Sequence, residues 1–162
     1  MSIDQERFMR VALEEAVKAR DKGNIAVGAV LVRVGRILAR GRNEVNSSFD
    51  ITAHAETATI RKLSKRLHIV NPSSLANAGL LDDCTLYTTV EPCPMCCWAI
   101  CIAGISTIVI GARLAQIGVR WGEYTIEKLI AITGRKIKLT SGILGKECAA
   151  LRLSGKYAPG AR

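Results

Sequence analysis

Two cysteines and one histidine have the residue types and the spacing of a metal site. Cys93 and Cys96 stand three positions apart in "EPCPMCCW" at the start of a predicted helix, so both sulfur atoms lie on one helix face. His54, in "TAHAE", opens a second predicted helix. The positive end of a helix dipole favours the thiolate form that binds metal. If both helix ends face one crevice, these three side chains can bind one Zn²⁺ ion.

Three protein ligands favour a catalytic zinc site over a structural one. Structural sites usually close with four protein ligands, whereas catalytic sites keep one position for water and lower its pKa to about 7. Glu56 follows His54 by two residues, and a carboxylate there can carry a proton from water to substrate. We therefore predict Glu56 as the catalytic acid–base. The alternative is an acid that only complements the dipole of its helix.

The other four cysteines are predicted to be small apolar core residues. They are Cys84, Cys97, Cys101 and Cys148. A disulfide framework is disfavoured, because 162 residues can bury a sufficient core without one. One alternative stays open, in which Cys97 or Cys101 supplies a fourth ligand and the zinc is purely structural. The second histidine, His68, is expected at an exposed helix end.

Composition indicates an ordinary globular protein: 49% of residues are apolar and 23% are charged. No apolar run approaches the roughly 20 residues that span a bilayer, and "MSIDQERFMR" is no secretory signal. We expect a cytoplasmic protein without a membrane partner. The net charge is +9, but the basic residues are scattered along the chain. This favours a solvated basic surface and leaves nucleic acid as a second, less favoured partner.

Hydrophobic periodicity and turn signals predict alternating helices and strands. Helices are expected over 4–22, 52–67, 92–104, 125–133 and 143–153, and strands over 25–34, 37–43, 84–90, 106–112 and 136–140. The order suggests an α/β fold with one sheet of about five strands, helices on both faces, and an antiparallel hairpin beside parallel strands. We expect one domain over 1–153 and a C-terminal tail over 154–162.

The histidine and cysteine segments resemble a known family. "HAE" and "PCPMC" fit the H-x-E…P-C-x-x-C signature of the zinc nucleobase, nucleoside and nucleotide deaminases, the cytidine/deoxycytidylate deaminase superfamily. The similarity extends over 5–153. "DDCTLYTTVEPCPMCCWAI" resembles the bacterial guanine deaminase and cytosine deaminase branches, and "TSGILGKECAAL" is similar to the tRNA adenosine deaminases. The resemblance implies a three-layer α/β/α sandwich around a five-stranded mixed sheet, one Zn²⁺ per chain and a homodimer.

The resemblance also implies a reaction and substrate contacts. The reaction is hydrolytic deamination, in which zinc activates a water molecule and Glu56 transfers protons to the ring and the leaving amine. Asn43, in "GRNEV", and the backbone at Ala55 match positions that contact the substrate in relatives. By position in the chain, Phe49 could stack on a base and Glu123 could pair with an amidine edge.

The expected substrate is a small nucleobase or nucleoside of the guanine or cytosine type. The segment "GARLAQIGVRWGEYT" departs from the loop typical of tRNA-editing relatives, and Ala26 replaces their usual proline. Trp98, Trp121 and Tyr124 are further candidates for the pocket wall. Two alternatives are kept: a tRNA adenosine-to-inosine deaminase and a non-catalytic structural zinc module.

Overall fold

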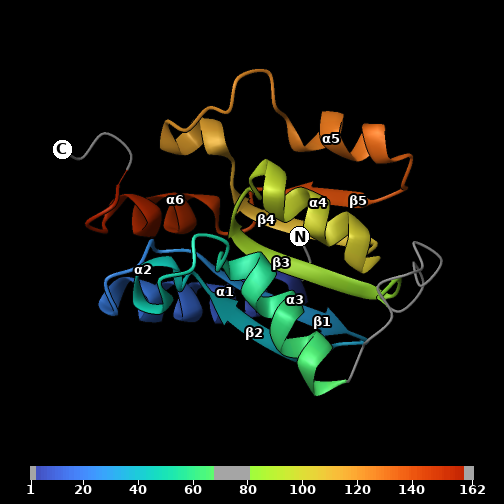
Figure 1. Ribbon diagram of the computed structural model, residues 1–162, viewed down its shortest axis with the longest axis horizontal. Coiled ribbons are helices and arrows are strands. Elements are labelled where there is room, and N and C mark those ends of the chain that lie inside the picture. The colour runs from blue at the N-terminus through green and yellow to red at the C-terminus, as the bar shows by residue number, and fades with distance from the viewer. Residues whose placement is uncertain (1–2, 68–80, 159–162) are drawn as a thin grey trace.

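The computed structural model describes residues 3–67 and 81–158 (Figure 1). Its helices are α1 (Ile3–Asp21), α2 (Val45–Ser48), α3 (Ala55–Arg66), α4 (Pro94–Ala103), α5 (Ile126–Thr133) and α6 (Gly145–Leu153), with a 3₁₀ turn, η2 (Leu114–Ile117). Its strands are β1 (Gly28–Arg33), β2 (Arg36–Arg42), β3 (Cys84–Val90), β4 (Thr107–Ala112) and β5 (Lys138–Ser141). Within these residues, each helix is too short or too polar to cross a lipid bilayer.

The five strands form one mixed sheet in the order β2-β1-β3-β4-β5. Strand β1 runs antiparallel to both β2 and β3, whereas β3, β4 and β5 are parallel. The carboxyl ends of β2, β3 and β4 therefore lie together at one end of the sheet, where these strands terminate. In open α/β sheets, ligands bind just beyond the carboxyl ends of the strands. The predicted hairpin beside parallel strands is confirmed.

Helices cover both faces of the sheet and complete three layers (Figure 1). On one face, α1 and α6 pack through residues such as Met9 and Cys148 against Val30 and Val109. On the other face, α3, α4 and α5 contribute residues such as Ile100 to a second core. The predicted α/β/α sandwich is confirmed. The hydrophobic periodicity that predicted the helices thus corresponds to the side chains that reach these cores.

The four cysteines outside the predicted zinc site are buried, and none of them is in a disulfide. Cys84, Cys97 and Cys101 lie in the core that α3, α4 and α5 form, and Cys148 lies in the other. They occupy the positions expected of small apolar side chains.

Two short helical turns were not predicted. The segment over 44–51, where no helix or strand is expected, contains α2, and there Asn24 Oδ1 accepts hydrogen bonds from the Asn46 and Ser47 amides at 2.9 and 3.0 Å. The second turn is η2, after β4. Helices this short have no apolar period, so tertiary hydrogen bonds and packing decide whether they form. His68 and residues 159–162 of the predicted tail lie outside the described residues.

Helix α3 packs onto β2 at Gly41. A Cβ atom at this position would lie 2.6 Å from the Ala55 carbonyl oxygen and 2.7 Å from the Thr59 amide nitrogen. The Thr59 hydroxyl donates a hydrogen bond to that carbonyl at 2.7 Å. Only glycine allows so close an approach. The first turn of α3, which follows His54, is thus seated directly on the sheet.

We expect Gly41→Ala to lower the free energy of unfolding by about 1–3 kcal/mol, because the added methyl group meets backbone that cannot move freely. Urea denaturation of the purified variant measures this change. Gly155→Ala is the matched control, since its Cβ would have nothing closer than 3.8 Å and should change stability by about 0.5 kcal/mol or less. Equal stabilities of the two variants would contradict the crowding at Gly41.

Candidate zinc and substrate site

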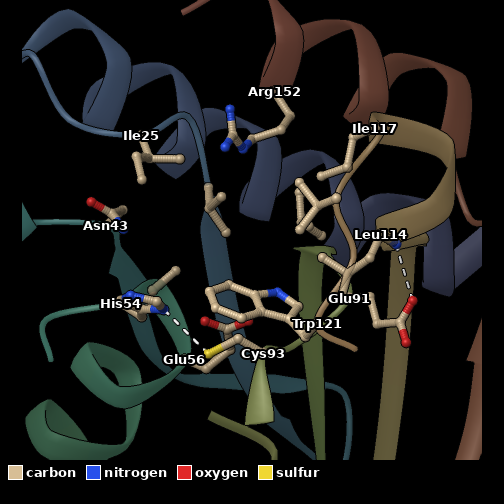
Figure 2. A pocket seen from close by; sticks show the side chains of 14 residues that line it. Ile25, Asn43, His54, Glu56, Glu91, Cys93, Leu114, Ile117, Trp121 and Arg152 are labelled. Carbon is tan, nitrogen blue, oxygen red and sulfur yellow. Dashed lines mark hydrogen bonds between the residues drawn. The ribbon is translucent and has the colours of Figure 1, made fainter. Parts of the chain in front are cut away.

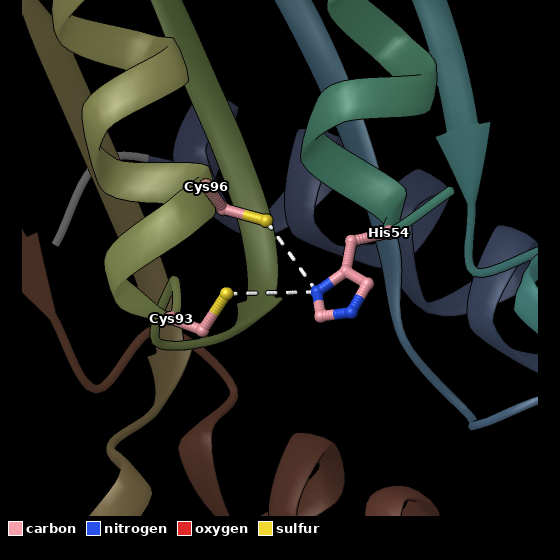
Figure 3. A group of neighbouring side chains, drawn as sticks. All are labelled: His54, Cys93 and Cys96. Atoms are coloured by element: carbon pink, nitrogen blue, oxygen red, sulfur yellow. Dashed lines mark hydrogen bonds between the residues drawn. The ribbon is translucent and has the colours of Figure 1, made fainter. Parts of the chain in front are cut away.

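The structure brings His54, Cys93 and Cys96 together (Figure 3). His54 is the N-cap residue of α3, and Cys93 is the N-cap residue of α4. His54 Nδ1 lies 3.6 Å from Cys93 Sγ and 3.5 Å from Cys96 Sγ. The three candidate ligand atoms all lie within 4.8 Å of one another. An imidazole and two thiol groups at this separation fit the ligand types and the size of a zinc site.

Local structure explains where the two cysteines lie. Pro94 occupies the first turn of α4, where its fixed φ and missing N–H are harmless. The Tyr124 hydroxyl donates a hydrogen bond to the Pro92 carbonyl oxygen at 2.7 Å. This bond ties the segment before Cys93 to the chain just before α5. Tyr124 therefore supports the metal site from outside it.

Without metal, the three side chains share protons, and only Cys93 is shifted toward the form that binds metal. The pKa of Cys93 falls to about 4, because the Cys96 thiol and then His54 hydrogen-bond to its thiolate. The same contact raises the pKa of His54. The pKa of Cys96 is raised by its hydrogen bond to Cys93 and by burial. Zinc binding would release the remaining protons, since cysteine binds metal as thiolate.

Glu56 lies buried beside these groups, with 3% of its surface exposed. Its pKa is raised because burial disfavours the charged carboxylate, and the nearby Cys93 thiolate adds repulsion. The Thr88 hydroxyl, 3.1 Å from Glu56 Oε1, donates to it and keeps the carboxylate from being an unsatisfied group. A carboxyl group with a raised pKa is suited to carrying protons near neutral pH.

A pocket opens beside Glu56 (Figure 2), with a cavity of about 120 Å³. Its apolar lining comes from Ile25, Val27, Val90, Leu114, Ile117, Val119 and Trp121. The segment around β1, the end of β3 and the chain after β4 thus form its walls. Apolar walls with a few convergent polar groups are typical of small-molecule and nucleobase sites.

The residues predicted to contact substrate divide into two groups. Asn43 and Ala55 line the pocket, and Asn43 Oδ1 accepts a hydrogen bond from the Val45 amide at 3.3 Å. Phe49 and Glu123 do not line it. Phe49 ends α2 with a positive φ of 56°, which turns its ring outward so that 96% of it is exposed. The Glu123 side chain is 99% exposed and pairs with Lys128.

Of the two tryptophans predicted for the pocket wall, one lines the pocket and the other does not. Trp121 lies at the pocket, in front of Glu56 and Cys93 in Figure 2. Trp98 lies elsewhere, in a hollow that Cys101 and Ile132 also line. Periodicity along α4 could not show which way Trp98 would point.

Sequence reasoning missed two charged residues of the pocket, Glu91 and Arg152. Glu91 Oε2 accepts a hydrogen bond from the Leu114 amide at 3.1 Å, and Arg113 lies 3.5 Å from Glu91 Oε1. These contacts fasten η2 over the pocket. The available signal for Glu91 was its place in "EPC", directly before Pro92. Arg152 carried no local signal beyond being a cation in the otherwise apolar "CAALRL".

Residues 2–112 match the family described as "cytidine and deoxycytidylate deaminase zinc-binding region". The chain belongs to this deaminase family. The resemblance inferred from the H-x-E and P-C-x-x-C motifs is confirmed at this level. Zinc is the metal of the family, and the three converging donors form a candidate site for it.

Several curated relatives of this chain are named as tRNA deaminases. It is 33% identical over 148 residues to the tRNA-specific adenosine deaminase of Bacillus subtilis, covering 90% of this chain and 84% of that protein. It is 38% identical over 108 residues to the Aquifex aeolicus enzyme of that name, 67% of this chain and 66% of the relative. It is 50% identical over 113 residues to the chloroplastic tRNA(adenine(34)) deaminase of Arabidopsis thaliana, 70% of this chain but 8% of the relative.

Solved structures show the same fold. A tRNA:A34 deaminase, studied for A-to-I editing at the wobble position of transfer RNA, has a TM-score of 0.73 and 33% identity. That match covers 90% of this chain and 98% of the other. The guanine deaminase of Nitrosomonas europaea has a TM-score of 0.72 and 25% identity, over 91% and 81% of the two chains.

The expectation of a small guanine- or cytosine-type substrate is wrong. The relatives described above are named tRNA deaminases, and they match at higher identity than the guanine deaminase does. The error came from the segment after β4, whose letters depart from the tRNA-editing pattern. In the structure this segment still forms η2 and supplies Leu114, Ile117, Val119 and Trp121 to the pocket wall. A loop whose sequence departs from a family pattern can still line a pocket, so the departure alone was weak evidence about the substrate.

We expect about one zinc ion per chain in the purified protein, measured by inductively coupled plasma mass spectrometry. Replacement of His54, Cys93 or Cys96 by alanine should remove most of the metal, because two remaining ligands make an incomplete site.

Cys97→Ala and Cys101→Ala are the matched controls, since both thiols are buried in the same helix and should leave the zinc content unchanged. Loss of zinc from either control would point instead to a four-ligand structural site.

Proposed function

We propose that this chain hydrolyses adenosine to inosine and ammonia in tRNA, at the wobble position 34. The observation that carries the proposal is the relationship to named tRNA-specific adenosine deaminases over as much as 90% of the chain. The solved tRNA:A34 deaminase, of which 98% is matched, supports the same assignment. The guanine deaminase shares the fold, but it matches at lower identity.

The candidate site contains the groups that this reaction needs. His54, Cys93 and Cys96 would hold the zinc ion, which, when bound, supplies Lewis-acid activation of water. Glu56 takes a proton from the attacking water and delivers it to the ring nitrogen next to the reacting carbon. It then takes the second proton of that water, which is now a hydroxyl group on C6, and gives it to the departing amine, so that adenine C6 exchanges its amino group for oxygen and ammonia leaves.

Other pocket residues position the base. Asn43, buried at the end of β2, presents a side-chain amide to the pocket (Figure 2), and the backbone at Ala55 borders the same space. Trp121 is 53% exposed, and its ring can stack on a base turned out of an RNA loop. The apolar walls exclude bulk water from the carboxyl group of Glu56, which keeps its pKa raised.

The charge of the chain is consistent with an RNA substrate. The net charge is +9 and the isoelectric point is near 9.6, so a polyanion is attracted over long range at low salt. A free neutral base would gain nothing from this charge. Homodimer formation stays a prediction, to be measured by sedimentation.

The test is inosine formation in a tRNA anticodon stem-loop that carries adenosine at position 34. The zinc-loaded protein should produce inosine, whereas Glu56→Gln should be slower by about 10²–10⁴-fold because it cannot carry protons. Its zinc content should stay unchanged, since Glu56 is not one of the three converging donors. Ammonia release from guanine and cytosine serves as the comparison. Turnover of either base without inosine in RNA would contradict the proposal.

A further inference from the structure

Arg152 is a half-buried cation that faces the pocket. It lies in the last turn of α6, and it is one of the residues that line the pocket together with Asn43 and Glu56. Figure 2 shows it across the pocket from His54, Glu56 and Cys93. Proton transfer by Glu56 does not require this guanidinium group.

The fold holds Arg152 toward the sheet. Cys148 stands one turn earlier, at i−4, and therefore shares its helix face. Cys148 is buried against β4, where a Cβ at Gly111 would lie 2.9 Å from Cys148 Cβ and 2.7 Å from the Thr89 carbonyl oxygen. Because α6 approaches β4 so closely, this face of the helix continues into the pocket at Arg152.

Arg152 has no carboxylate partner among the described residues. Its Nη1 donates a hydrogen bond to the Tyr157 carbonyl oxygen at 2.8 Å, and the other N–H groups of the guanidinium remain available to a ligand. Burial without a compensating negative charge lowers its pKa. No nitrogen of Arg152 is both buried and unpartnered, so its remaining N–H groups are accessible to an anion from outside the chain.

Two other partly buried arginines behave differently. Arg42 lies 3.1 Å from Glu15 and 3.4 Å from Glu44. Arg113 lies 2.7 Å from Glu127. Both have carboxylates in their own chain, so the missing carboxylate at Arg152 is particular to the pocket-facing position.

We propose that Arg152 binds a backbone phosphate of the RNA next to the target nucleoside, and so selects a nucleotide within a strand over a free base. The inference rests on the proposed function. The cavity of about 120 Å³ is small beside the roughly 300–1,000 Å³ of sites that enclose whole drug-sized ligands. It can take the base, while the phosphates stay at the rim, where Arg152 lies. The planar guanidinium fork suits bidentate phosphate binding.

The experiment measures kcat and KM for the adenosine-34 stem-loop across a range of salt concentrations. Arg152→Gln should raise KM about tenfold, as expected for one lost charge-assisted hydrogen bond, and leave kcat within about twofold. The slope of log(kcat/KM) against log[salt] should become shallower by about 0.7–0.9, because one phosphate contact is lost. Arg152→Lys keeps the charge without the fork and should have an intermediate KM.

Arg36→Gln is the matched control. It removes the same charge from an exposed residue at the start of β2, at the other end of the sheet from the pocket, and should change KM and the salt slope little. Thermal unfolding of each variant separates lost binding from lost structure.

The inference would be overturned if Arg152→Gln had the same KM and salt slope as Arg36→Gln, or if its kcat collapsed at unchanged KM. Adenosine monophosphate is assayed as a second substrate. The inference would also be overturned if Arg152→Gln lost turnover of this nucleotide and kept turnover of the RNA. This last result would assign the phosphate to a free nucleotide. Failure of the unsubstituted protein to form inosine in RNA would instead refute the proposed function itself.

Discussion

The site depends on one constraint: side chains at the starts of two helices that are far apart in sequence must lie within 4.8 Å of one another. His54 precedes α3 and Cys93 precedes α4, and 39 positions separate them. The strand order brings their starts together, because β2 and β3 have their carboxyl ends at the same end of the sheet, where the pocket lies. A shift of α3 along β2 would separate the imidazole from the thiol groups and displace Glu56 at the same time. The tight contact at Gly41 is therefore part of the catalytic architecture.

At this end of the sheet, burial of a carboxyl group costs stability but serves the proposed chemistry. Glu56 is buried, and so is the Thr88 hydroxyl that hydrogen-bonds to it. A leucine at position 56 would meet no such desolvation cost. A buried carboxyl group with a raised pKa is typical of functional sites, which agrees with the proton-carrying role proposed for Glu56. Tyr124 and Glu91 lie further out, and each hydrogen-bonds to a backbone group and so holds a segment beside the pocket in place.

The parts that could be predicted from sequence are those with a local signal. Alternation and 3.6-residue periodicity located all five strands and every helix longer than one turn, and the motif spacing singled out the three donors that the structure brings together. The features that could not be predicted depend on backbone conformation or packing that no local sequence pattern encodes. Phe49 was placed near the substrate from its position in the chain, but the positive φ at the end of α2 decides its direction. Arg152 was overlooked because only the packing of α6 on β4 carries it to the pocket. The substrate could not be predicted from the loop after β4, because its sequence departs from the tRNA-editing pattern while the chain as a whole is similar to named tRNA deaminases.

The sheet ends in β2 on one side and in the four-residue β5 on the other. Exposed edge strands are templates for aggregation, since their free N–H and C=O groups can pair with another chain. Here β2 begins with Arg36 and β5 begins with Lys138, and neither has a carboxylate partner among the described residues, whereas Arg40 and Arg42 do. Two copies that approached edge to edge would bring these like charges together. The positive charge of this protein therefore has a second consequence, which is that it helps to keep concentrated molecules from joining their sheets into fibrils.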